Sequence, residues 1–344
     1  MKHVFFGLGL AAGLAASTAA MAQPASGGGN APADGGAARV AILNLGPPEP
    51  GEVPADLIGI HITAAMLEAA IPLLEQDKVD TVVLRINSTG GNTDEIAALH
   101  EMIQSRYAKK FRTVAWVRNA GGAGGITVLS VPEWYFHTAG TFGPAQAGGM
   151  GVGKEERELL LDLGKKVGES SGRPSEFIRA VQAGTQVSVD VDSAGAAVWQ
   201  EGDAGGFKLN EPRTPLVLTA ADAERVKLSK GTARTKEDLA EVMGLKKVEW
   251  AGESATKAMD EAREDVVKAD AAADMAYRGY LKALGAANRA AKKDRAALIT
   301  DARGKLDALY KLWQEKPVLA KLYPFNKGWY DQQVGKLTEL EAKK

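Results

Sequence analysis

The chain has 344 residues, 45% of them hydrophobic, and contains no cysteine. Its 42 basic and 43 acidic side chains give a formal net charge of -1, which provides no basis for binding nucleic acid or an anionic membrane surface. Without cysteine, a thiol nucleophile, thiolate metal sites and disulfides are excluded. Apart from His3, the histidines are His61, His100 and His137; they lie at no metal-like spacing, so we expect neither a metal site nor another cofactor.

The first 22 residues are typical of a signal peptide. Lys2 and His3 precede a run of apolar residues, and Ala20 and Ala22 form a small-x-small cleavage site. We therefore expect a mature chain that starts near Gln23 and is exported, either to the periplasm or out of the cell. An uncleaved membrane anchor is the alternative, although the run is short beside the roughly 20 apolar residues of a spanning helix. Residues 23–38 are rich in Gly, Ala and Pro, which predicts a disordered linker.

Strands and helices alternate in the next part of the chain. Apolar, β-branched runs predict buried strands at 39–45, 81–87 and 113–119, with a fourth strand leading to residue 144. Helical spacing of apolar residues predicts helices over 58–74 and 95–107. This order is typical of βαβ units around a parallel sheet covered on both faces. Residues 39–248 are therefore predicted to form one α/β domain.

The composition changes in residues 249–344. Ala, Lys, Asp and Glu dominate and glycine is scarce, which favours long helices. We expect a coiled-coil-like helical hairpin with a break at Gly285, followed by a last helix within 326–344. Such a region is typical of a packing or oligomerisation module.

Two glycine-rich turns follow predicted strands. In residues 88–91, Ser-Thr-Gly-Gly, the glycines allow backbone N–H groups to converge on one anionic oxygen beside a helix start, as an oxyanion hole requires. A glycine pair is also an ordinary connector between a strand and a helix. In residues 120–125 a strand bends sharply into a helix, which is the geometry of a nucleophile elbow. This elbow contains only Gly and Ala, and therefore no nucleophile.

Taken in order, these elements resemble the ClpP/crotonase superfamily, and most closely its NfeD-type and signal-peptide-peptidase-type serine peptidases. Residues 87–91, Asn-Ser-Thr-Gly-Gly, are similar to the family's N-S-P-G-G turn, and residues 121–125 to its A-A-S-A-G elbow. Residues 136–145 resemble the M-A-P-G-T-x-x-G segment, and 218–233 the LT-x-E-E-A element. The resemblance implies stacked ββα units with a parallel sheet, and assembly into trimers or rings.

The family's mechanism implies a serine nucleophile, which falls here on Gly122, or on Ala123 if the elbow is shifted by one residue. Neither residue can attack a carbonyl group. The resemblance also implies oxyanion or peptide-binding donors at Gly90, Gly91 and Ala123. The shell of the site is thus expected to persist while its reactive oxygen is missing.

The general base of the family is a lysine, which falls here on Lys154, at the start of a predicted helix. Lys165 and Lys166 are alternatives in register, and an exposed lysine at a helix start is also commonly only solvated. The ClpP-type histidine has no counterpart, because its position is occupied by Ala147. His137 is expected to be a half-buried structural side chain rather than a base.

The leading interpretation is an exported pseudo-peptidase that binds an extended peptide or an acyl-like group, so enzymatic activity is left open. One alternative is an active serine-type peptidase with a non-standard nucleophile, for which Ser88, Thr127 and Ser130 are the hydroxyls to consider; a hydroxyl without an aligned base is a poor nucleophile. Crotonase-type thioester chemistry is a further alternative. The last is an oligomeric structural adaptor, whose C-terminal helices bind another envelope protein.

Overall fold

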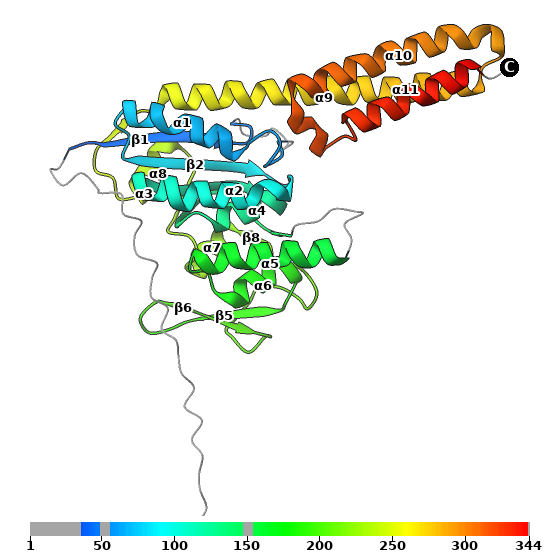
Figure 1. Ribbon diagram of the computed structural model, residues 1–344. Coiled ribbons are helices and arrows are strands. Elements are labelled where there is room, and N and C mark those ends of the chain that lie inside the picture. The colour runs from blue at the N-terminus through cyan, green and yellow to red at the C-terminus, as the bar shows by residue number, and fades with distance from the viewer. Residues whose placement is uncertain (1–35, 49–55, 147–153, 343–344) are drawn as a thin grey trace, which may run out of the picture.

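The computed structural model describes residues 36–48, 56–146 and 154–342. A mostly parallel sheet lies between helices, and long helices follow it at the C-terminal end of the chain (Figure 1). The predicted fold class, an α/β fold with a parallel sheet and a helical C-terminal region, is confirmed. The signal peptide and most of the linker, expected in residues 1–22 and 23–38, lie outside the described residues.

The main sheet has, in the described part of the chain, the strand order β10-β1-β2-β3-β4-β8, with β9 also pairing with β4. All pairs are parallel except β4 with β8. Because neighbouring strands are parallel, β2 and β3 end at the same edge of the sheet, where the two glycine turns follow. The strands are β1 (Ala38–Leu45), β2 (Thr81–Ser88), β3 (Arg112–Ala120), β4 (Glu133–Phe142), β8 (Leu218–Thr219), β9 (Thr232–Ala233) and β10 (Val248–Trp250).

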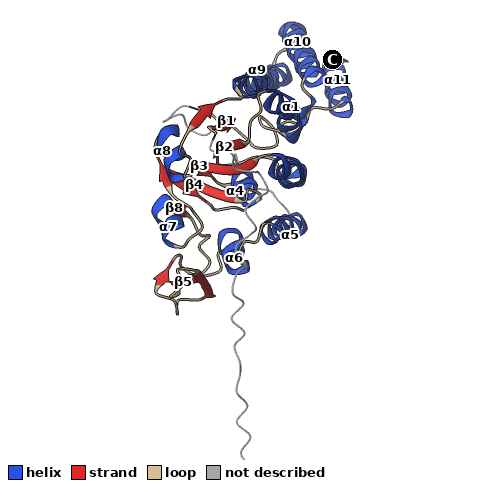
Figure 2. Ribbon diagram, turned by 90° about the vertical axis from the view of Figure 1, so that its left-hand side faces the viewer, coloured by secondary structure: helices blue, strands red, loops and turns tan. Residues whose placement is uncertain are grey.

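Helices cover both faces of this sheet, with α8 on one side and α1 and α4 on the other (Figure 2). In β2, Val82 and Leu84 belong to the core under α1 and α4, whereas Val83 belongs to the core under α8. Burial on both faces explains why the central strands are continuous apolar runs. The helices are α1 (Ala64–Gln76), η1 (Thr93–Glu95), α2 (Ile96–Glu101), η2 (Met102–Tyr107), α3 (Ala108–Lys110), α4 (Gly122–Leu129), α7 (Ala220–Arg225) and α8 (Lys236–Val242).

The segment from Ile58 to Ile62 differs from the prediction. A helix was expected from Ile58, but α1 begins only at Ala64. Gly59 has a φ of +82°, and Ile58 forms isolated bridges with Ile62 and Gly91 instead. The apolar residues of this segment are buried because they line the first glycine turn, and so their spacing imitates a helical face.

A small antiparallel sheet, which the sequence did not predict, follows two helices in the middle of the chain. Its strands are only two to five residues long. The first, VSVDV, alternates apolar and polar residues, but the other two lack the alternation of a typical strand. Trp199 packs on Phe177 with ring centroids 5.2 Å apart, which joins this sheet to the main domain. The elements are α5 (Lys154–Ser170), α6 (Ser175–Ala183), β5 (Val187–Val191), β6 (Ala197–Glu201) and β7 (Phe207–Lys208).

The C-terminal region is a projecting three-helix arm (Figure 1). The first part of α9 lies beside α1 and β1, and its second part packs with α10 and α11 around a separate core. The predicted break at Gly285 is wrong, because α9 continues to Arg289 and packing against α10 outweighs the roughly 1 kcal/mol helix cost of one glycine. The elements are α9 (Glu253–Arg289), α10 (Lys292–Glu315), η3 (Pro317–Lys321) and α11 (Lys327–Ala342).

Candidate functional site

The first glycine turn, which we call the cradle, comprises residues 88–92 at the end of β2. The Ile58 N–H donates to the Gly90 carbonyl over 3.2 Å, and the Asn92 N–H donates to the Ile58 carbonyl over 2.8 Å. Gly91 has a φ of +147°, and a Cβ at this position would overlap the Ile58 carbonyl oxygen. Only glycine fits there, because both the backbone angle and the space exclude a side chain.

The second turn, the elbow, joins β3 to α4. Gly121 is extended, Gly122 turns with a φ of +50°, and the Gly122 N–H donates to the Pro144 carbonyl over 2.8 Å. Two residues further on, a Cβ at Gly124 would overlap the Ser88 carbonyl oxygen. The glycines therefore let α4 start sharply and lie directly on the end of β2.

The cradle and the elbow are in contact. A Cβ built at Gly122 would lie 3.2 Å from the Thr89 carbonyl oxygen and 3.3 Å from Gly90 Cα, and one built at Gly91 would lie 2.9 Å from Ala123 Cβ. The structure thus brings together Gly90, Gly91, Gly122 and Ala123. Within the described part of the chain, the N–H groups of Gly90, Gly91 and Ala123 donate to no acceptor.

These amides define what the site can do chemically. Backbone N–H groups in a glycine turn and at the start of a helix bind carboxylate or polarised carbonyl oxygens. An N–H group can stabilise an oxyanion but cannot attack a carbonyl carbon, and Gly122 has no side chain to do so. The arrangement therefore suits binding of an acyl oxygen.

Lys154 is the first residue of α5, and its side chain lies outside what the structure describes. Lys165 and Lys166 are both exposed on the same helix, and Lys165 pairs with Glu169 at 3.9 Å. Ala147 also lies outside the described residues.

His137 lies on the opposite face of the sheet from α4. Its ring is 6.1 Å from that of Trp116, and its Nδ1 accepts from the Ala139 N–H over 3.3 Å. Burial, helped by the charges of Arg118, Arg234 and Arg85, lowers the pKa of His137 below its ordinary value. These contacts, with Trp116 and Ala139, involve neither the cradle nor the elbow.

The alternative hydroxyls already have partners. Ser88 is fully buried and donates to the Asp56 carbonyl over 2.7 Å. Thr127 donates to the Ala123 carbonyl of its own helix over 2.9 Å. Ser130 lies 3.0 Å from His100 Nδ1, and burial lowers the pKa of that histidine. These contacts give each hydroxyl a structural role.

A polar ladder that the sequence did not reveal crosses three strands beside the site. Asn119 Nδ2 donates to Asn87 Oδ1 over 3.0 Å, and the Thr141 hydroxyl donates to Asn119 Oδ1 over 3.1 Å. Asn87 Nδ2 donates to the Pro47 carbonyl over 3.0 Å. The sequence offered one signal for this ladder, which is a polar residue near the end of each of three predicted parallel strands. The ends of neighbouring parallel strands meet at one edge of the sheet, so such residues can contact one another.

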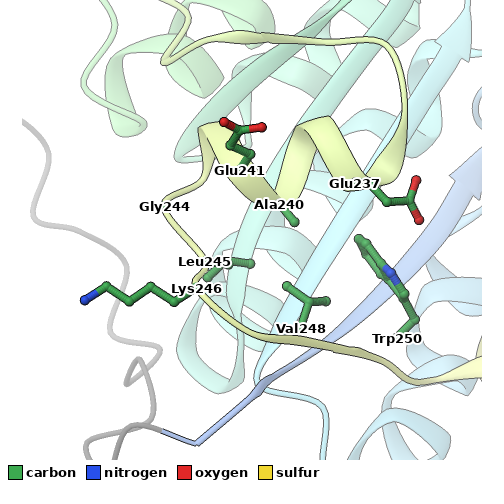
Figure 3. Close-up of a pocket in the computed structure, with 8 residues that line it drawn as sticks. All are labelled: Glu237, Ala240, Glu241, Gly244, Leu245, Lys246, Val248 and Trp250. Carbon is green, nitrogen blue, oxygen red and sulfur yellow. The ribbon is translucent and has the colours of Figure 1, made fainter.

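A hollow in the described part of the protein lies elsewhere. It has a volume of about 510 Å³ and lies between α8 and β10 (Figure 3). Because β10 pairs with residues 38–40 at the start of β1, this hollow lies near the opposite end of the strands from the cradle. It is lined by Glu237, Ala240, Glu241, Gly244, Leu245, Lys246, Val248 and Trp250.

No group of three or more His, Cys, Asp or Glu side chains among the described residues is placed to hold a metal ion. None of the helices in this part of the chain has the length and apolarity needed to cross a bilayer.

Fold and site together define an α/β protein with a glycine cradle beside an elbow that contains only Gly and Ala. Neither a protein-family profile nor a curated protein matches the sequence. Among solved structures, the chain is similar to a serine-to-alanine variant of the 1510-N membrane-bound stomatin-specific protease, at 14% identity and a TM-score of 0.43 over 60% of this chain and 85% of that one. It is also similar to a lysine-to-alanine variant of that protease in complex with a substrate peptide, at 14% identity and a TM-score of 0.41 over 60% and 80%.

Proposed function

We propose that this protein is a pseudo-peptidase of the ClpP/crotonase superfamily, resembling NfeD-type and signal-peptide-peptidase-type serine peptidases, and that it binds an extended peptide without cleaving it. The ligand's carbonyl or carboxylate oxygen is bound by the amides of Gly90, Gly91 and Ala123. The observation that carries this proposal is the contact between cradle and elbow, where a side chain at Gly122 would project toward Thr89 and Gly90. Binding donors are present, and the position of a nucleophile is glycine.

The proposal includes a cellular setting that follows from the sequence. The leader in residues 1–22 directs the chain to the periplasm or out of the cell, where a protein without cysteine is indifferent to redox conditions. We further propose a homo-oligomer, a trimer or a ring, as the family resemblance implies. N-terminal sequencing of the mature protein and light scattering of the purified chain test these two points.

A second candidate function is that of an oligomeric envelope adaptor. The observation that favours it is the arm, which has its own hydrophobic core and projects from the α/β domain (Figure 1). In this case another envelope protein binds the C-terminal helices and the cradle binds nothing. Peptide binding by the purified protein separates the two functions.

Fluorescein-labelled casein, an unfolded protein, is a suitable probe. We expect its fluorescence anisotropy to rise on adding the protein while no fragments are released. Gly122→Asn should abolish most of this binding, since asparagine tolerates a positive φ and its side chain would fill the contact between elbow and cradle. We expect the affinity for casein to fall by about tenfold or more, and a tenfold change corresponds to about 1.4 kcal/mol.

Gly195→Asn is the matched control. Gly195 also has a positive φ, of +80°, and a Cβ there would meet nothing within 4 Å. The Gly195→Asn variant should bind casein like the unmodified protein. Equal binding by Gly122→Asn, or release of casein fragments by the unmodified protein, would refute the proposal.

A further inference from the structure

Residues 56–62, which we call the wall loop, form one side of the cradle. Besides the two hydrogen bonds between Ile58 and residues 90 and 92, Leu57 Cδ2 would lie 3.3 Å from a Cβ at Gly90. The peptide unit between Asp56 and Leu57 is held at both ends: its carbonyl accepts from Ser88 Oγ over 2.7 Å, and its N–H donates to His61 Nδ1 over 3.0 Å. The position of this loop therefore sets the shape of the cradle.

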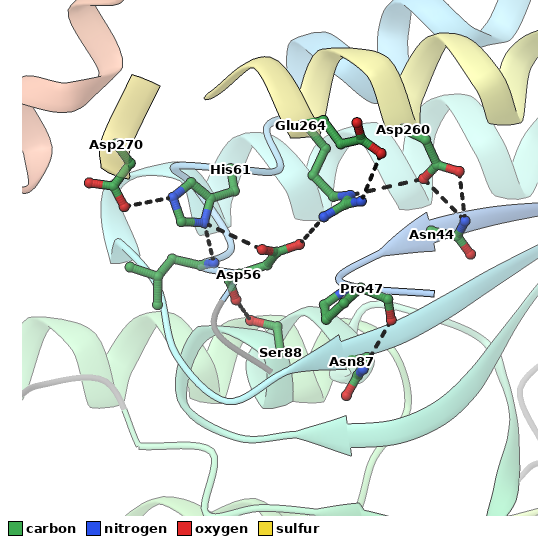
Figure 4. A network of polar contacts seen from close by, with 11 residues as sticks. Asn44, Pro47, Asp56, His61, Asn87, Ser88, Asp260, Glu264 and Asp270 are labelled. Carbon is green, nitrogen blue, oxygen red and sulfur yellow. Dashed lines mark hydrogen bonds and ion pairs between the residues drawn. The ribbon is translucent and has the colours of Figure 1, made fainter. Parts of the chain in front are cut away.

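The other side of the wall loop is held by α9. Arg263 Nη1 lies 2.7 Å from Asp56 Oδ2, and His61 Nε2 lies 3.1 Å from Asp270 Oδ2 (Figure 4). The Arg263 and Asp56 side chains are only 10% and 6% exposed. Separating a buried ion pair costs more free energy than separating an exposed one, because it leaves a buried charge without a partner. This pair therefore holds the loop strongly.

The segment that follows α10 adds a second attachment. Lys321 Nζ donates to the Gly59 carbonyl over 3.2 Å and lies 3.2 Å from Glu95 Oε2. Glu95 in turn accepts from the Ala64 N–H, at the start of α1. The Tyr323 hydroxyl donates to Asp270 Oδ1 over 2.7 Å and so orients the carboxylate that faces His61. Lys321 and Tyr323 thus brace the same loop.

We propose that Arg263, Asp270 and Lys321 are positioning residues for the cradle, so that the helical arm and the peptide-binding site form one functional unit. The arm holds the wall loop in the geometry that leaves the Gly90 and Gly91 amides available to a ligand. A protein that binds the arm and shifts α9 or η3 would therefore change peptide affinity. The ligand part of this inference rests on the proposed function, whereas the coupling between arm and cradle does not.

Two variants test the coupling. Lys321→Met removes the contacts of Lys321 with the Gly59 carbonyl and with Glu95. The double variant Asp56→Asn with Arg263→Met removes both charges of the buried Asp56–Arg263 pair together, so that neither is left facing a neutral partner. Hydrogen exchange followed by mass spectrometry should show exchange in segments 56–62 and 88–92 faster by about tenfold or more, as expected when local opening becomes easier. Exchange in residues 112–118 of β3 should stay unchanged.

Lys316→Met is the control for Lys321→Met. Lys316 lies five residues earlier and pairs with Asp265 of α9 at the surface, without touching the wall loop. The Lys316→Met variant should show the same exchange rates in segments 56–62 and 88–92 as the unmodified protein. Wild-type exchange rates in 56–62 and 88–92 for both folded test variants would overturn the inference.

Casein affinity gives the second readout. We expect Lys321→Met and the double variant to weaken binding in parallel with the faster exchange, while Lys316→Met binds normally. Faster exchange with unaltered casein affinity would contradict the positioning role. If the unmodified protein binds no casein, the proposed function fails, and the exchange experiment still decides whether the arm holds the cradle.

Discussion

Asn119 Nδ2 donates a 3.0 Å hydrogen bond to Asn87 Oδ1, and this bond joins the strand that ends at the elbow to the strand that ends at the cradle. The register between β2 and β3 shifts just before this pair. Irregularities of this kind re-aim side chains and are frequent beside functional sites. The amide pair fixes the two strand ends relative to each other where the backbone ladder is interrupted.

Asn119→Asp tests this bond with almost no change in shape. Aspartate would bring an oxygen against Asn87 Oδ1, and Asn87 cannot simply turn over because its Nδ2 already donates to the Pro47 carbonyl. We expect the free energy of unfolding to fall by about 1–3 kcal/mol at neutral pH, measured by urea denaturation. Asn288→Asp, at an exposed amide that donates to the Leu284 carbonyl, is the control. Similar losses for both variants would show that the ladder is unimportant.

Gly122→Ser restores a hydroxyl at the elbow. The φ of +50° and the 3.2 Å approach to the Thr89 carbonyl oxygen should lower the melting temperature, because a side chain in the left-handed region costs about 1–2 kcal/mol. We expect a fluorophosphonate probe to label this variant and not the unmodified protein. Adding Lys154→Ala should remove the labelling, since the resemblance places the general base there.

Gly195→Ser, at a solvent-facing glycine of positive φ, controls for labelling of any strained serine. Folding of the Gly122→Ser variant is checked by its circular dichroism spectrum. A folded Gly122→Ser protein that the probe ignores would mean that the elbow does not correspond to the family's nucleophile position.

Much of the architecture follows from the sequence because it depends on local patterns. The buried strands, the helices between them and the sharp glycine elbow all show in residue type and spacing. Contacts between distant residues do not. Nothing near His61 indicates that its partner is Asp270, which is 209 residues away. Likewise, the apolar spacing from Ile58 suggests a helix, whereas burial against Gly91 produces the same spacing without one.

Glu133 offers a test of stability that does not involve the cradle. Its carboxylate, 8% exposed, receives hydrogen bonds of 3.1 and 3.0 Å from Arg112 and one of 3.0 Å from Lys230. Burial by itself would raise the pKa of Glu133, but the hydrogen bonds and charges of Arg112 and Lys230 together lower it below the ordinary 4.5. The ionised carboxylate therefore stabilises the folded state.

Glu133→Gln should destabilise the protein by about 1–3 kcal/mol at pH 7, because Arg112 loses its charged acceptor. A lowered folded-state pKa means that the stabilisation is complete above 4.5 and is lost as the pH falls through the folded-state value. The difference in melting temperature between the two proteins should therefore shrink below pH 4.5. A difference that is constant with pH would contradict this assignment.

Asp260 should show the opposite dependence on pH. Burial raises the pKa of its carboxyl group above the ordinary 3.8, although the hydrogen bond from Asn44 and the charges of Arg263 and Arg85 oppose this. The folded state therefore holds the proton more tightly than the unfolded state, and ionisation of Asp260 lowers stability as the pH rises through the folded-state value.

Asp260→Asn removes this ionisation but keeps an oxygen that accepts from Asn44 Nδ2, which lies 3.1 Å from Asp260 Oδ1. We expect the variant to gain stability relative to the unmodified protein between pH 4 and pH 7, measured as the difference in melting temperature. Asp274→Asn, at an exposed carboxylate on the same helix that pairs with Arg278, provides the control. A relative loss of stability for Asp260→Asn as the pH rises would mean that its attraction to Arg263 outweighs burial, and α9 would then be attached to the sheet by charge rather than by a neutral hydrogen bond.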